Sequence, residues 1–191
     1  MRFVTLGPEG TCHENAVKNY LSHHSLNDCE ILLLDNLFDG LEMIRQGEAD
    51  YLVQCSAHPN VHLITEKYFQ EIFVTDTFIF PTKDLALLED ASIKHPHTLG
   101  LVKATEGYLG QITYSEIIYE TSKPIVGENL INGKYDAGLA YLEHYLANPG
   151  RFRMRLHIGP VITTWLVYGK RTAFRGSLLA AADKGFYENL S

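Results

Sequence analysis

The sequence predicts an α/β protein made of two lobes, and three observations support this prediction. First, short apolar runs alternate with segments of helical periodicity, which is typical of parallel strands covered by helices. Second, two segments, 68–81 and 153–169, are rich in β-branched and aromatic residues and exceed the usual strand length of about five or six residues. Third, a chain of 191 residues is long enough for two small lobes or for one large domain.

The first expected elements are a strand at 2–6 and a helix at 11–23. The Gly-Pro pair at 7–8 stops the strand. Thr11 and Glu14 have the spacing of a capping box, which starts the helix. Because the N–H groups at such a helix start attract anions, this turn is the first candidate binding site.

The alternation of strands and helices continues along most of the chain and predicts parallel sheets. Further strands are expected at 30–34, 50–55, 98–102, 116–119 and 136–140, and further helices at 36–46, 105–113, 125–133 and 141–147.

The two long segments divide the predicted fold into lobes. Strands that run from one sheet into another would account for their length: the first would carry the chain into a second lobe, and the second would return it. Lobe one is then 1–75 plus 156–191, and lobe two is the inserted segment 76–155. We expect the active site in the cleft between the lobes, where pockets tend to form.

Composition and charge limit the classes of partner. The net charge of −7 argues against nucleic acid and anionic membrane surfaces, although a pocket can still attract an anionic small molecule. No apolar run approaches the roughly 18 residues of a membrane span, and the chain starts with a strand rather than a secretory signal. Three cysteines without metal-type spacing indicate reduced thiols, so we expect a cytoplasmic protein without a metal site.

Three segments of the chain resemble prephenate dehydratases. The turn at 6–11, LGPEGT, resembles the opening motif of that family. The segment 133–145, GKYDAGLAYLEHY, looks like a later family segment, and 159–169, GPVITTWLVYG, falls where the family has a Thr-Arg-Phe motif. The resemblance implies the two-lobed, type II periplasmic-binding-protein-like fold of the dehydratase catalytic domain, here without the regulatory ACT domain.

The sequence also departs from the dehydratase pattern in two places. The family's Glu-Asn-Ser-Thr-Glu-Gly-Ser stretch is replaced by QCSAHPNVH at 54–62, and Thr-Arg-Phe becomes Thr163-Thr164-Trp165. These departures make the chain similar to the small, single-domain prephenate decarboxylases of the bacilysin type. That branch implies a lyase of antibiotic biosynthesis that needs no cofactor and converts prephenate to a dihydro-hydroxyphenylpyruvate-type product.

Two alternatives remain open at this point. One is a prephenate dehydratase that forms phenylpyruvate, and the other is a non-catalytic module that binds a small carboxylate. The expected partner is therefore prephenate or a similar dicarboxylate. A homodimer is a further expectation, because related enzymes commonly associate and symmetric dimers are the commonest assembly.

Two residues are expected to be catalytic. The resemblance assigns to Thr163 the contact with the ring hydroxyl that the family gives to its motif threonine. His58 lies in the altered loop and is the expected proton donor, because imidazole titrates near neutral pH. His13, by contrast, is expected to be an ordinary polar residue on the first helical turn.

A second carboxylate site is expected where a cation, Lys103, precedes a helix start at Thr105. Trp165 is expected to provide an apolar wall for the substrate ring. The full set of expected substrate-binding residues is Glu9, Gly10, Thr11, Cys12, Ser56, Lys103, Thr105, Thr164 and Trp165.

Overall fold

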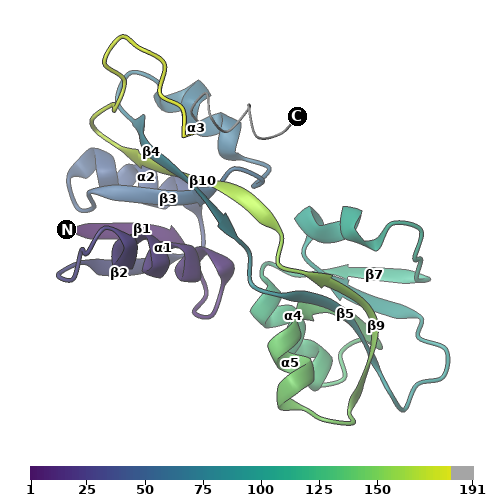
Figure 1. The fold of residues 1–191 in the computed structure, drawn as a ribbon. Helices are drawn as coiled ribbons and strands as arrows, with labels where there is room; N and C mark the ends of the chain where they lie inside the picture. Colours follow the sequence, from purple (N-terminus) through teal and green to yellow (C-terminus); the bar gives the residue numbers. More distant parts are fainter. Residues whose placement is uncertain (182–191) are drawn as a thin grey trace, which may run out of the picture.

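A computed structural model describes residues 1–181 and shows two lobes, each built on a mixed five-stranded sheet (Figure 1). The two-lobed α/β architecture predicted from the sequence is therefore confirmed. The last part of the predicted lobe one, 182–191, lies outside the described residues. Among the described residues, no helix combines the length and the apolar character needed to cross a bilayer.

The first sheet has the strand order β2-β1-β3-β10-β4. Its strands are β1 (Arg2–Leu6), β2 (Glu30–Leu34), β3 (Tyr51–Cys55), β4 (Phe73–Pro81) and β10 (Ile162–Gly169). The helices that cover it are α1 (Cys12–His23), α2 (Leu37–Gln46) and α3 (Val61–Tyr68). Helix α1 packs its apolar side on one core cluster of the sheet, whereas α2 and α3 share another.

The second sheet has the strand order β7-β6-β8-β5-β9. Its strands are β5 (Leu85–Asp90), β6 (Thr98–Leu101), β7 (Glu116–Tyr119), β8 (Ala137–Tyr141) and β9 (Phe152–Gly159). Around it lie the 3-10 helix η1 (Lys103–Leu109) and the helices α4 (Lys123–Ile131) and α5 (Leu142–Ala147). Two buried clusters of this lobe form its core.

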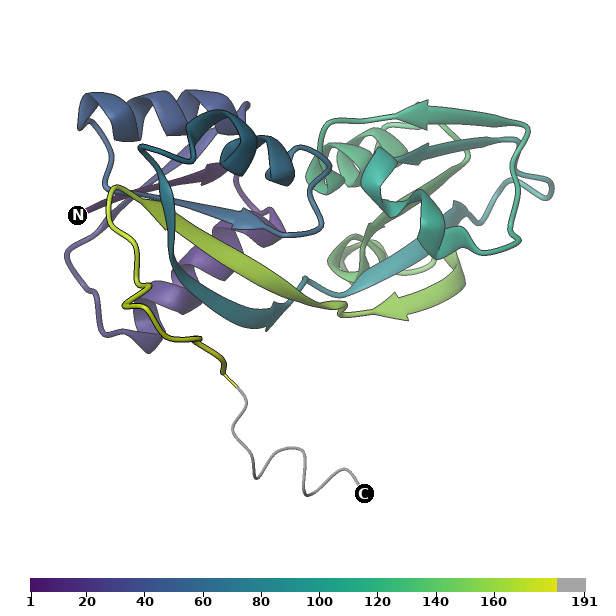
Figure 2. The same cartoon turned by 90° about the horizontal axis from the view of Figure 1, so that it is seen from above.

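Two short crossings connect the lobes side by side (Figure 2). One joins β4 to β5 through 82–84, and the other joins β9 to β10 through 160–161. The crossings are hydrogen-bonded to each other: Thr82 N–H donates to the Val161 carbonyl at 2.8 Å, and Val161 N–H donates to Thr82 Oγ1 at 3.0 Å.

The prediction of parallel sheets is wrong, because both sheets are mixed. In the first sheet β1, β2 and β3 are parallel, but the returning strand β10 is antiparallel to β3 and β4. In the second sheet β5 is antiparallel to β8 and β9. The reason is topological, because a chain that crosses into a second lobe and comes back adds strands that run both ways.

The crossings lie later than the predicted division at 75/76 and 155/156. Residues 76–81 belong to β4 of the first sheet, and 156–159 belong to β9 of the second. The segment 153–169 contains two strands because Gly159, with φ of +80°, and Pro160 interrupt it. We therefore propose a division of the chain into domains at the crossings.

Other elements differ from their predicted ranges. Helix α3 and strand β5 were not expected, and the predicted helix 105–113 is the shorter 3-10 helix η1. Helix α4 begins two residues earlier than 125, because Ser122 takes the N-cap position and Pro124 fits the first turn.

Candidate active site

A cavity of about 320 Å³ lies between the two lobes. The first lobe contributes the start of α1, the loop after β3 and the start of β10. The second lobe contributes the start of η1, the segment 120–123 and the end of β8, and both crossings reach the rim. Because both sheets supply walls, the cavity exists only when the two lobes meet.

The cavity brings together some of the predicted site residues. Those that line it are Thr11, Cys12, His58, Lys103, Thr105 and Thr163. Those that do not line it are Glu9, Gly10, Ser56, Thr164 and Trp165. Glu9 and Ser56 are exposed to solvent, whereas Trp165 is fully buried.

The donors at the start of α1 are largely engaged within the protein. Thr11 Oγ1 accepts a hydrogen bond from Glu14 N–H at 3.3 Å and donates one to the Leu6 carbonyl at 3.2 Å. The Glu14 carboxylate accepts Gly10 N–H at 2.6 Å, so the expected capping box forms with Gly10 as its backbone donor. The Thr11 side chain therefore caps the helix and has little capacity left for a ligand.

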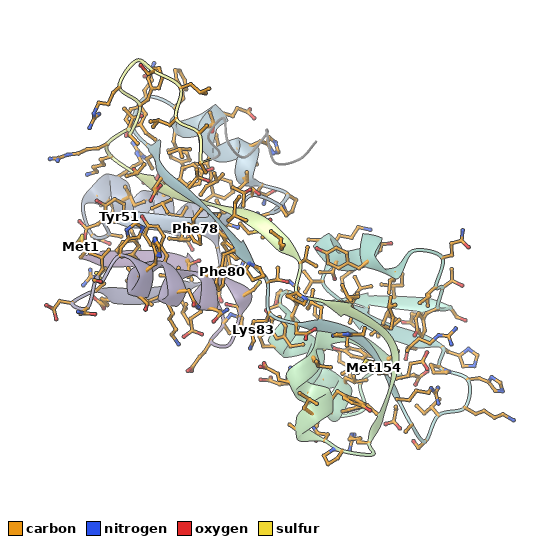
Figure 3. All side chains as sticks on the ribbon, in the orientation of Figure 1. Met1, Tyr51, Phe78, Phe80, Lys83 and Met154 are labelled. Carbon is orange, nitrogen blue, oxygen red and sulfur yellow. The ribbon has the colours of Figure 1, made fainter. Side chains whose placement is uncertain are left out.

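Contacts between the lobes use the same turn. The Tyr141 hydroxyl, at the end of β8, accepts Cys12 N–H at 2.8 Å. Lys83 lies in the first crossing (Figure 3), where its ammonium group donates to the Gly10 carbonyl at 3.0 Å and pairs with Glu143 at 2.6 Å. These bonds fix the two lobes around the cavity.

The predicted second carboxylate site at Lys103 is occupied by protein groups. Lys103 pairs with the Glu106 carboxylate and donates to the Tyr119 hydroxyl at 3.0 Å, which raises its pKa. The Thr105 hydroxyl donates to the Val102 carbonyl at 2.7 Å and so closes the 3-10 turn. Both residues line the cavity. The hydroxyl hydrogen of Thr105 is used, whereas Lys103 keeps one of its three N–H donors and has its charge compensated by Glu106.

The catalytic residues expected from the sequence, Thr163 and His58, lie on the first-lobe wall. Thr163 Oγ1 is 3.6 Å from Cys55 Sγ. The Nδ1 atom of His58 accepts Asn60 N–H at 3.2 Å, which leaves Nε2 to carry the proton of the neutral ring. Partial burial lowers the pKa of His58 from its ordinary value of 6.5.

Trp165 belongs to the core beneath the cavity. Its exposed fraction is 0 %, and its indole N–H donates to the Phe80 carbonyl at 3.0 Å. Its ring is stacked with Phe78 at 6.3 Å and meets the His13 ring edge-on at 5.2 Å. With no free surface, the indole supports the wall of the cavity and does not itself form the wall.

His13 was expected to be an ordinary polar residue of the first helical turn, but it lines the cavity. Its Nε2 atom is 3.0 Å from Nε2 of Gln54, a fully buried residue of β3. Desolvation, together with the smaller effects of the charges of Lys123 and His58, lowers the pKa of His13 to about 3. The imidazole is therefore neutral at physiological pH. A histidine two residues after the cap of a helix that faces a cleft is the signal that could have found it.

We expect this neutral imidazole to make stability depend on pH. Below pH 6.5 the unfolded state binds a proton at His13 and the folded state does not, until the pH approaches the folded pKa of about 3. Stability is therefore lost as the pH falls. Between pH 7 and about pH 4.5 the loss due to His13 should be about 2 kcal/mol, because the ring is only partly shielded from cavity water.

The measurement is urea unfolding at both pH values for the native chain and for His13→Gln. The variant should lose about 2 kcal/mol less on acidification. His58 and His144, whose pKa values burial also lowers, contribute to both proteins and cancel in the comparison. His23→Gln, at an exposed position of the same helix, should behave as the native chain does. Equal acid losses in His13→Gln and the native chain would show that His13 is protonated in the folded state.

The segment 120–123 is the second feature that sequence reasoning missed. Glu120 pairs with Lys134 at 2.8 Å and accepts Asn129 Nδ2–H at 2.8 Å, so its charge is compensated. Lys123 lines the cavity and forms no ion pair within residues 1–181. The Ser-Lys-Pro sequence at 122–124, a cap residue with proline in the first turn, could have indicated this helix start.

No known protein-family model matches the chain, and no curated protein matches it in sequence. Solved structures do match. A prephenate dehydratase from Arthrobacter aurescens in complex with L-Phe gives a TM-score of 0.64 at 15 % identity, over 93 % of this chain and 63 % of that one. An ABC transporter from Parabacteroides distasonis gives 0.59 at 18 % identity, over 88 % of this chain and 65 % of that one. The periplasmic VFT2 domain of Bordetella pertussis BvgS gives a TM-score of 0.54 at 15 % identity, over 90 % of this chain and 80 % of that one.

These similarities define the class of fold. The protein has the two-lobed α/β fold of periplasmic-binding-protein-like domains, as predicted, and a prephenate dehydratase is among the proteins that share it. The chain spans less than two thirds of the length of the dehydratase and the transporter chain. At these identities the similarity concerns the fold alone.

Proposed function

We propose that the protein is a lyase that acts on prephenate, or on a closely similar cyclic dicarboxylate, in the cavity between the lobes. In this proposal it removes one carboxylate as carbon dioxide, retains the ring hydroxyl and uses no cofactor. The observation that carries the proposal is the charge of the cavity. Lys103 and Glu120 are each compensated by a protein partner, and Lys123 lacks an ion pair among the described residues.

An anionic ligand would supply the missing partner of Lys123. Lys123 is half-buried, so its charge is only partly hydrated, and a carboxylate within the cavity would gain an ion pair with it. The net charge of the whole chain is −7, yet this wall carries an uncompensated positive charge. The cavity therefore favours a small carboxylate over a cation or a neutral ligand.

The residues around Thr163 favour decarboxylation over dehydration. Expulsion of the ring hydroxyl needs an acid at that oxygen. Among the described residues, the Thr163 hydroxyl contacts the thiol of Cys55 at 3.6 Å, which is a weak contact. The carboxyl group of Glu120, which also lines the cavity, is engaged by Lys134 and by the Asn129 amide. Neither group is a strong acid catalyst for loss of water, and in this proposal His58 delivers its proton to a ring carbon rather than to the ring hydroxyl.

Decarboxylation does not need an acid catalyst at the ring hydroxyl. The bond between the ring carbon and the carboxylate carbon breaks, its electron pair enters the diene of the ring, and a proton adds to a ring carbon. Desolvation of the leaving carboxylate promotes this step. His58 is the proposed proton donor, since His13 stays neutral down to a pKa of about 3. The neutral His58 is then protonated again by water.

The product of incubation with prephenate tests the proposal. We expect carbon dioxide release and a non-aromatic product with the mass of a dihydro-hydroxyphenylpyruvate, followed by mass spectrometry and ultraviolet absorbance. Thr163→Val should still bind prephenate but should turn it over more slowly, because the hydroxyl no longer positions the ring. Formation of phenylpyruvate by the native chain would mean a dehydratase, and tight binding without turnover at any pH would mean a binding module. Cytoplasmic location and homodimer formation remain predictions.

A further inference from the structure

An unpartnered hydroxyl marks the start of helix α4. Ser122 is 7 % exposed and stands on the cavity wall at the N-cap position of this nine-residue helix. Its Oγ atom is buried and has no hydrogen-bond partner among the described residues. Since a buried hydroxyl without a partner is costly, the position favours a ligand that supplies an acceptor.

The first turn of α4 is open in a way that the first turn of α1 is not. At α1 the cap side chain bonds to Glu14 N–H, and Tyr141 takes the Cys12 N–H. At α4 Ser122 makes no such side-chain bond, and the first backbone bond runs from Val126 N–H to the Ser122 carbonyl at 3.1 Å. The positive end of α4 is therefore available to an anion.

Lys123 adds a charge at the same place. It is the first residue of α4, lines the cavity and makes no ion pair within residues 1–181. Its charge reaches across the cavity, since it contributes to the lowered pKa of His13 on the opposite wall. Glu120, the carboxylate of the same segment, is turned to Lys134 and Asn129 and does not cancel it.

We propose that Ser122 and Lys123 form a subsite for one carboxylate of the ligand, with the hydroxyl donating to the carboxylate and the ammonium group pairing with it. This inference rests on the proposed function and adds to it which carboxylate binds where. An ion pair stabilises a carboxylate and so slows its loss as carbon dioxide. The carboxylate held by α4 is therefore the one that is retained, the 2-oxo acid, and the leaving carboxylate faces the first-lobe wall at Thr163 and His58.

The test uses phenylpyruvate as a probe of the 2-oxo acid and its methyl ester as an uncharged match. By calorimetry, Ser122→Ala should weaken phenylpyruvate binding about tenfold, and Lys123→Met should weaken it at least as much. Binding of the ester should be the same in all three proteins. Ser115→Ala and Lys94→Met, at exposed positions of the same lobe, should bind phenylpyruvate as the native chain does.

Thermal unfolding without ligand separates a binding role from a capping role. In the ligand-free protein the Ser122 hydroxyl has no hydrogen-bond partner among the described residues, so its removal should not lower stability. The Tm of Ser122→Ala should therefore equal or exceed that of the native chain. A lower Tm with unchanged affinity for phenylpyruvate would overturn the inference and make Ser122 a helix cap. Unchanged affinity in both variants, with prephenate still converted, would overturn the subsite and leave the proposed function standing. Phenylpyruvate binding that depends on both residues, without conversion of prephenate, would support the subsite and end the proposed function.

Discussion

Replacement of His58 by glutamine is expected to lower kcat/KM for prephenate about 100-fold near pH 6, because a positioned acid typically contributes about 10²- to 10⁴-fold. The imidazole lines the cavity, and in its neutral form Nδ1 accepts Asn60 N–H at 3.2 Å. Protonation at Nδ1 gives up this bond and forms the imidazolium, whose Nε2–H is then acidic enough to be delivered to the substrate. Glutamine keeps a polar side chain of similar reach but cannot donate a proton to carbon.

The pH dependence of kcat/KM tests whether the protonated form of His58 is the active one. The active form in this mechanism is the imidazolium, and burial lowers the pKa of His58 below 6.5. The kcat/KM of the native chain should therefore fall as the pH rises through that lowered pKa, by about tenfold per pH unit above it. His58→Gln should show a low and flat profile over the same range.

His62→Gln is the matched control. His62 lies in α3 next to the same loop, is exposed and does not line the cavity, so its replacement should leave both the rate and the profile unchanged. If His58→Gln retains the rate and the pH dependence of the native chain, the proton comes from another group. The chemical step would then have to be assigned anew.

Much of the fold follows from local patterns. Strand β1, the Gly-Pro turn and the capping box of α1 are adjacent in the sequence, and their residues determine one another through short-range hydrogen bonds. The lengths of the two long segments predicted the crossings, because strands that continue from sheet to sheet need more residues than one strand does. Their exact positions depend on the pairing of β4 with β10, a contact between residues far apart in the chain.

The site could be predicted only in part, for the same reason. Thr11, Cys12 and Thr163 lie where β/α turns and a returning strand meet, and the sequence indicated them. Whether a donor is free depends on distant partners that no local pattern reveals. Tyr141 reaches Cys12 from a position 129 residues away, and Tyr119 reaches Lys103 across 16 residues.

At Ser122 and His13 the sequence analysis failed to predict residues that do line the cavity. Both are small local features of helix starts, and both gain significance only because the opposite lobe closes over each of them. Burial of a polar group at a lobe interface is a property of the assembled cavity. The sequence can indicate that Ser122 is a helix cap, but it cannot indicate that the Ser122 hydroxyl lacks a hydrogen-bond partner among the described residues of the folded protein.

Replacement of Trp165 by leucine should cost about 3 kcal/mol of stability, because large-to-small changes in a core remove both apolar contacts and volume. The indole is fully buried, stacked with Phe78, and its N–H satisfies the Phe80 carbonyl at 3.0 Å. For a chain of this size, the Tm should fall by roughly 6–12 °C. Far-UV circular dichroism is the suitable measurement, since the variant lacks the only tryptophan of the chain.

Trp165→Phe separates a core role from the substrate contact that the sequence predicted. Phenylalanine keeps an aromatic ring but loses the bond to the Phe80 carbonyl, so the loss of stability should be about 1–2 kcal/mol. The KM for prephenate should change less than about twofold, because the indole lies beneath the cavity wall. Ile162→Ala, at a position of the same strand that is 74 % exposed, should change stability by less than about 0.5 kcal/mol. A Trp165→Phe protein with native Tm and a tenfold higher KM would instead show that the indole touches the ligand. In that case the lobes would have to open further than the structure shows, exposing the ring between His13 and Phe78.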